Sequence, residues 1–197
     1  NEWSALAEKA VLVSGVYGDA VVVSEIMYHP ADGYPEFVEL ANTGNVPVIL
    51  DGFRFTRGIY YDFRNETVLQ PGAAIVLTND TTLFREKYGF AAKGQFTRKL
   101  ANAGEVLKLQ NRSKQLVDSV PYSDTIPWPV LADGDGFSIE LSDVKADNSV
   151  AENWRISATK NGSPNPQVEL LAENGVIYPN PFREKVFVEL ENPGTVA

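Results

Sequence analysis

Short runs of β-branched and aromatic residues recur along the chain, and clusters of glycine, proline, asparagine and aspartate separate them. Residues 36–40 alternate as in a strand, with Val38 and Leu40 on one face and Phe37 on the other beside the two glutamates. Residues 137–141 alternate as well, with Phe137 expected in the core and Ser138 expected in solvent. The same pattern predicts further strands at residues 21–28, 48–50, 53–56, 73–77, 106–110 and 115–120.

One short helix is expected at residues 81–88. Asp80 can cap its first turn, and Gly89 suits the left-handed position after its last turn. Phe84 and Tyr88 lie one turn apart and therefore share a face. Long amphipathic helices that alternate with strands are absent from the pattern. It predicts an all-β fold, an antiparallel β-sandwich with one short helix.

The 197 residues include 26 acidic and 17 basic side chains, which gives a net charge of −9. Such a chain is repelled by phosphate backbones and anionic lipid, so we expect no nucleic-acid binding over a broad face. No apolar run approaches the roughly 18 residues that span a bilayer, so we expect no membrane insertion. The absence of cysteine excludes disulfides, cysteine nucleophiles and thiolate metal sites. An isolated sandwich of this charge is expected to be a monomer.

His29 is the only histidine in the chain. Zinc hydrolase sites usually take two or three imidazoles, and a Ser-His-acid triad would have to use this residue. A general base is one interpretation of His29. Because it ends a predicted strand directly before Pro30, we interpret it as a turn residue.

Three glutamates form the most notable acidic group: Glu25, Glu36 and Glu39. Paired carboxylates about 5–9 Å apart could serve as acid and nucleophile of a glycosidase. The alternative is structural, in which Glu39 accepts hydrogen bonds or pairs with Arg54 or Arg57. A buried glutamate needs such a partner.

The segment Asp-Gly-Asp-Gly at residues 133–136 has a composition that can bind calcium. Asp133 and Asp135 stand one residue apart and could share a hard cation. The residues that follow do not fit the EF-hand template, and a glycine-rich turn that leads into a strand is the alternative. We expect no cofactor, with calcium at these two aspartates as the one candidate.

Several aromatic residues lie in or beside predicted loops, where flat rings can stack on sugar faces or on a protein partner. The candidate ligand-binding residues are Tyr60, Tyr61 and Trp128, and Tyr34 and Tyr122 are similarly placed. Core packing is the alternative for each of them.

Nine short segments follow one another along the chain: SEIMYHP, EFVEL, NTG, LDGFRF, LQPG, LANAGE, WP, ADGDGFSIEL and NW. In order and spacing these segments resemble the lamin tail domain of bacterial secreted proteins, over about residues 20–167. The resemblance implies an immunoglobulin-like β-sandwich, and it supports a structural role for the glutamates.

The flanks resemble parts of other modules. Residues 1–19 look like the C-terminal end of a preceding β module. Residues 168–197 are interpreted as a linker and the truncated start of a C-terminal sorting domain, because YPNPF at residues 178–182 resembles the type IX secretion signal. The resemblance implies an extracellular or outer-surface location in a Gram-negative bacterium.

Together these features predict a non-catalytic interaction, spacer or attachment module of a secreted or surface-exposed multidomain protein. Its expected partners are neighbouring domains of the same chain, and a surface protein or polysaccharide. Two alternatives stay open: a carbohydrate-binding accessory module of an attached hydrolase, and a glycosidase or nuclease that uses Glu25, Glu36 or Asp133.

Overall fold

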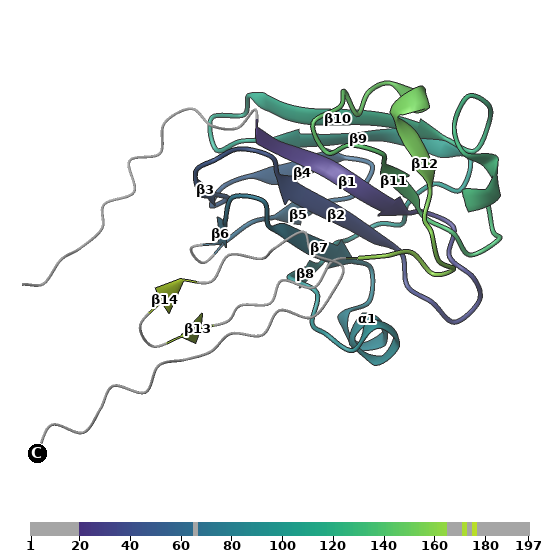
Figure 1. The fold of residues 1–197 in the computed structure, drawn as a ribbon, viewed down its shortest axis with the longest axis horizontal. Helices are drawn as coiled ribbons and strands as arrows, with labels where there is room; N and C mark the ends of the chain where they lie inside the picture. Colours follow the sequence, from purple (N-terminus) through teal and green to yellow (C-terminus); the bar gives the residue numbers. More distant parts are fainter. Residues whose placement is uncertain (1–19, 65–66, 165–170, 173–174, 177–197) are drawn as a thin grey trace, which may run out of the picture.

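Two β-sheets pack face to face in the computed structural model, which describes residues 20–64, 67–164, 171–172 and 175–176 (Figure 1). The larger sheet has six strands in the order β12-β11-β1-β2-β7-β8. The smaller has four strands in the order β10-β9-β4-β5. This arrangement confirms the predicted all-β fold, and it is consistent with an immunoglobulin-like sandwich.

The larger sheet is antiparallel except at one edge, where β7 and β8 run parallel. Its strands are β1 (Val21–Met27), β2 (Phe37–Asn42), β7 (Ala74–Thr78), β8 (Gly94–Gln95), β11 (Ile139–Leu141) and β12 (Trp154–Ile156). The parallel pair was not predicted from sequence, because a two-residue strand shows no alternation.

The smaller sheet is antiparallel throughout. Its strands are β4 (Arg54–Arg57), β5 (Tyr61–Asp62), β9 (Gly104–Gln110) and β10 (Leu116–Ser123). Two-residue pairs join β3 (Val48–Ile49) to β6 (Val68–Leu69), and β13 (Leu171–Ala172) to β14 (Gly175–Val176). Short 3-10 helices cover Val130–Ala132 and Ala151–Asn153.

The main core lies between the sheets and takes alternate residues from each strand. Val38 and Leu40 of β2 meet Leu107 and Leu109 of β9 in one buried cluster. The prediction for residues 137–141 was wrong at its start. Phe137 is half-buried beneath Lys160, whereas Ser138 is completely buried, because β11 begins only at Ile139 and the Ser138 hydroxyl donates a hydrogen bond inside the protein.

Helix α1 (Thr81–Tyr88) covers part of the outer face of the larger sheet (Figure 1). The Asp80 carboxylate accepts hydrogen bonds from the Thr82 and Leu83 amides, and Gly89 has φ 79°. Phe84 is buried in a second, smaller apolar cluster with Phe37 and two other side chains. The predicted helix and both of its caps are confirmed.

Within the described residues no helix is long and apolar enough to cross a bilayer. The predicted flanking segment 1–19 lies outside the described residues, as does the sorting motif at 178–182.

Candidate functional site

Three glutamates lie side by side on the outer face of the larger sheet. Glu25 of β1 is directly opposite Glu39 of β2 and Glu140 of β11. Glu25 and Glu39 are buried, and Glu140 is half-buried. Like charges in directly opposite positions of neighbouring strands destabilise a sheet, so this row requires compensating contacts.

Hydroxyl groups provide those contacts. The Ser24 hydroxyl donates to Oε1 of Glu39 at 2.7 Å, and the Ser138 hydroxyl donates to Oε1 of Glu25. The Arg155 guanidinium binds Glu140 at 3.0 Å at the exposed end of the row. The structural hydrogen bond predicted for Glu39 is therefore confirmed.

The segment 161–163 covers Glu25. The Ser163 amide donates to Oε1 of Glu25 at 2.8 Å, and the Ser163 hydroxyl donates to Glu140 at 2.7 Å. The Tyr88 hydroxyl donates to the Asn161 carbonyl at 2.7 Å, which ties the segment to α1. Gly162 has φ +80°, and a Cβ atom there would lie 2.7 Å from the Glu25 carboxylate, so only glycine fits.

Burial raises the pKa of Glu25 from its ordinary 4.5 to about 8, and the charge of Glu39 adds to the effect. The hydrogen bonds from Ser138 and Ser163 act in the opposite direction. A general acid needs such a pKa. However, the Glu25 side chain is only 3% exposed and lies beneath segment 161–163, so a substrate has no access to it in this arrangement.

Glu36 holds a different part of the fold. Its carboxylate accepts a hydrogen bond from the Leu100 amide at 2.9 Å, and its own amide donates to Asn79 at 3.0 Å. Burial raises the pKa of Glu36, and the contact with Leu100 opposes that rise. Glu36 therefore anchors the loop at residue 100 to the start of β2.

His29 and Asp133 form a pair, with Nδ1 and Oδ1 2.6 Å apart. Gly134 lies against the imidazole, where a Cβ atom would be 3.1 Å from Cε1, and it has φ +82°. The turn at residues 133–136, which precedes β11, is thus fixed to the end of β1, as expected for a turn residue at His29.

Asp133 contacts an imidazole, and Asp135 is exposed. In the described part of the chain, no three His, Cys, Asp or Glu side chains are grouped so that they could hold a metal ion. Calcium binding at Asp133 and Asp135 stays a prediction from sequence.

The predicted aromatic site is divided between two places. Tyr60 is 46% exposed beneath the Arg98 guanidinium, and Tyr61 packs against Phe63 with ring centroids 4.8 Å apart. Trp128, expected to offer its ring at a loop, is only 7% exposed and packs against Trp154 at 5.8 Å. Tyr122 is also buried. Ligand binding at Tyr60 and Tyr61 stays a prediction, whereas the Trp128 ring packs against Trp154 inside the protein.

A buried carboxylate that was not predicted from the sequence links the two sheets. Asp118 of β10 accepts hydrogen bonds from the Val23 amide of β1 at 2.7 Å and from the Asn148 side chain at 2.8 Å. Burial raises the pKa of Asp118. The sequence does indicate a buried acid here, because Asp118 alternates with Val120 and Tyr122 on the buried face of β10.

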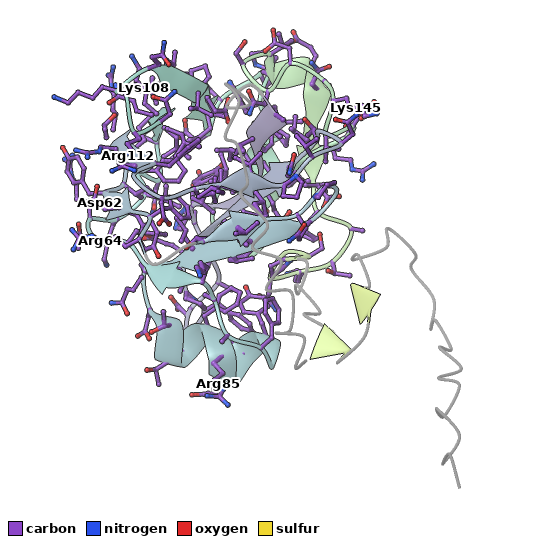
Figure 2. The ribbon with its side chains drawn as sticks, turned by 90° about the vertical axis from the view of Figure 1, so that its left-hand side faces the viewer. Asp62, Arg64, Arg85, Lys108, Arg112 and Lys145 are labelled. Carbon is purple, nitrogen blue, oxygen red and sulfur yellow. The ribbon has the colours of Figure 1, made fainter. Side chains whose placement is uncertain are left out.

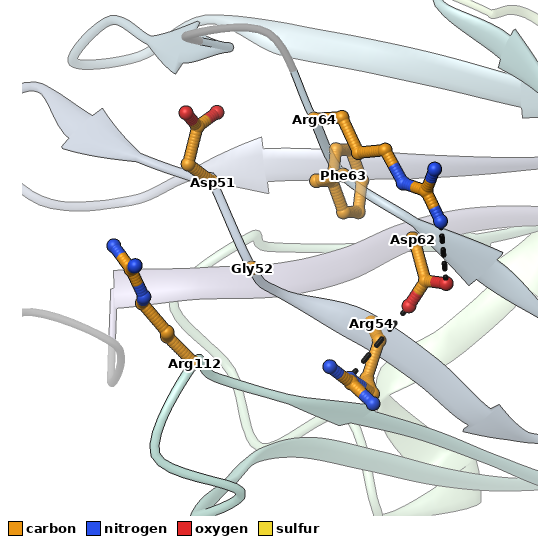
Figure 3. Close-up of a pocket in the computed structure, with 7 residues that line it drawn as sticks. All are labelled: Asp51, Gly52, Arg54, Asp62, Phe63, Arg64 and Arg112. Atoms are coloured by element: carbon orange, nitrogen blue, oxygen red, sulfur yellow. Dashed lines mark ion pairs between the residues drawn. The ribbon is translucent and has the colours of Figure 1, made fainter.

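An arginine-lined hollow at the end of the smaller sheet was not predicted from the sequence either (Figure 3). Arg54, Arg64 and Arg112 line it, and they come from three separate segments of the chain. These arginines become neighbours only in the folded chain, so their spacing in the sequence could not predict the hollow.

Comparison with known families matches residues 17–124 to the model described as Lamin Tail Domain. A search of curated proteins finds no match. The match ends just after β10, and β11 and β12 then extend the larger sheet beside β1.

Proposed function

This chain belongs to the lamin tail domain family, and from that membership we propose that it is a non-catalytic interaction, spacer or attachment module. The observation that carries the proposal is that its candidate catalytic acids are engaged in hydrogen bonds within the fold. Glu25, Glu36 and Asp133 each have a hydrogen-bond partner that belongs to the fold. A catalytic pair needs two carboxylates that converge on an accessible bond.

The internal partners differ in kind, which supports the same proposal. Glu25 holds the segment at Ser163, Glu36 holds the loop at Leu100, and Asp133 holds the imidazole of His29. Each contact joins residues more than sixty positions apart in sequence. These acids therefore serve long-range cohesion of the sandwich, and the exposed turns are left to meet partners.

The experiment is a hydrolysis assay with the purified chain, 4-nitrophenyl glycosides and bis(4-nitrophenyl) phosphate. We expect product release at the rate of buffer alone. Turnover that disappears in Glu25→Gln, Glu36→Gln or Asp133→Asn would contradict the proposal, because each substitution removes an ionisable group and keeps the shape of the side chain.

The proposed setting is a secreted or surface-exposed multidomain protein of a Gram-negative bacterium, in which neighbouring domains are the first partners. The motif YPNPF at residues 178–182 supports export through type IX secretion. Protease treatment of intact source cells, followed by immunoblotting for this chain, tests the location. We expect digestion without lysis, and protection until lysis would refute surface exposure.

A further inference from the structure

A hollow of about 350 Å³ opens beside the turn between β3 and β4. Arg54, Arg64 and Arg112 line it together with Asp51 and Asp62 (Figure 3). Its volume falls at the lower end of the range for small-molecule sites, enough for a single sugar residue. Neither the family match nor the predicted aromatic site includes this group as a binding site.

Backbone hydrogen bonds fix the floor of the hollow. The Gly52 amide donates to the Phe63 carbonyl at 3.0 Å, and the Phe63 amide donates to the Phe53 carbonyl at 2.9 Å. The Asp51 carboxylate accepts a hydrogen bond from the Thr67 amide at 3.0 Å. The backbone that carries the polar groups of the hollow is therefore held by hydrogen bonds within the fold.

Arg112 projects from the turn between β9 and β10. The Asn111 side chain accepts hydrogen bonds from the Ser113 amide at 2.9 Å and the Gln115 amide at 3.0 Å, which holds that turn. The stem of Arg112 crosses Gly52, where a Cβ atom would lie 2.9 Å from its Cγ. Glycine at position 52 thus leaves room for Arg112 at the hollow.

The three arginines are not equally occupied. Asp62 lies between Arg54, at 3.6 Å, and Arg64, at 3.5 Å (Figure 3). Arg112 lies on the other side of Gly52, and among the described residues it forms no ion pair. The guanidinium of Arg112 is therefore available to an anion from outside.

The surroundings strengthen the positive charge. Lys108 of β9 lies on the same side of the molecule as Arg112 and Arg64, whereas Arg85 lies at the far end on α1 (Figure 2). The chain as a whole has a net charge of −9, so this local group of cations differs in charge from the protein as a whole. Such a group attracts a negatively charged ligand.

From the mixed lining we infer that this hollow binds a uronic acid residue of an acidic polysaccharide. Arginine binds a carboxylate through paired hydrogen bonds. The aspartates accept hydrogen bonds from hydroxyl groups, which a sugar ring supplies. An acidic peptide offers carboxylates without those hydroxyl groups, and a neutral sugar leaves the arginines unpartnered.

The inference rests on the proposed function, because it names the polymer to which the attachment module binds. It differs from the aromatic platform expected at Tyr60 and Trp128, since the recognition here is ionic. Such contacts at an exposed site weaken as salt rises.

The test is calorimetric titration of the full chain with trigalacturonate in low-salt buffer. We expect binding that weakens about tenfold in Arg112→Gln, since a charge-assisted hydrogen bond contributes about that factor. The matched control is Arg85→Gln, which makes the same change of charge on an exposed residue of α1 and is expected to bind like the unaltered chain. Both positions are exposed, and thermal unfolding checks that both variants are folded.

Three results would overturn the inference: absence of binding, equal loss in Arg112→Gln and Arg85→Gln, or equally tight binding of hexaglutamate or of neutral maltotriose. Tight binding of hexaglutamate identifies an acidic protein segment as the occupant. None of these results bears on the hydrolysis assay, so failure of the uronate site and failure of the non-catalytic module are told apart by separate measurements.

Discussion

Replacing Glu25 with glutamine should make the protein more stable at neutral pH and less sensitive to pH. The carboxyl group is buried opposite Glu39, and burial raises its pKa to about 8. Glutamine keeps an oxygen that can accept the hydrogen bonds from Ser138 and Ser163. The substitution therefore removes the free-energy cost of keeping a proton on this carboxyl group at neutral pH and preserves these contacts.

The sign follows from the difference between the folded and unfolded states. Between pH 4.5 and 8, the folded protein keeps a proton on Glu25 that the unfolded chain has released. Stability therefore falls as pH rises through this window, by up to about 1.4 kcal/mol per pH unit. From about pH 5 to 7.5 the loss amounts to roughly 3 kcal/mol for this one group.

The assay is urea unfolding at a series of pH values, with Glu25→Gln compared with the unaltered chain. Burial raises the pKa of Glu36 and Asp118 as well, so the stability of Glu25→Gln should still fall as pH rises. The fall should be less steep than in the unaltered chain by up to about 1.4 kcal/mol per pH unit, which is the contribution of one proton. Glu152→Gln, a change at an exposed glutamate, serves as the control. An unchanged slope in Glu25→Gln would show that Glu25 does not take up a proton on folding.

Three further predictions concern the contacts that hold the sandwich together. Asp118→Ala should lower the free energy of unfolding, measured in urea, by about 2–3 kcal/mol, because it leaves the buried Val23 amide and the Asn148 side chain without their hydrogen-bond acceptor. A loss below the experimental error would contradict this. Asp80→Ala should cost about 1 kcal/mol by removing the helix cap, measured by thermal unfolding, whereas Asp80→Asn should cost less. Gly162→Ala should cost at least about 1–2 kcal/mol in the same assay, since its backbone is left-handed, and an unchanged melting temperature would argue against a covered Glu25.

Local chemistry made the helix and several strands predictable from sequence. Asp80 and Gly89 act within one turn of α1, so the helix ends are encoded by neighbours in the chain. Alternation identified β2 as a strand, but both of its faces are buried, because Val38 packs in the main cluster and Phe37 packs in the smaller one. The family resemblance agrees with the match over residues 17–124.

Tertiary contacts account for what could not be predicted. Glu25, Glu39 and Glu140 become neighbours only through the order of β11, β1 and β2 in the sheet. Ser138 is buried because Glu25 needs a donor, and Trp128 is buried because Trp154 packs against it. Burial of these residues depends on contacts with distant parts of the chain, which the alternation within one segment cannot predict.

In this protein the carboxylates of the sandwich maintain the fold, and an exposed end of the sandwich is the proposed binding surface. A backbone amide NMR titration of the full chain with trigalacturonate locates the bound ligand. We expect shifts at residues 51–54, 62–64 and 111–113, with the amides around Glu25, Glu36 and Asp133 unchanged. Shifts centred on His29, Glu36 and Asp133 would contradict this expectation.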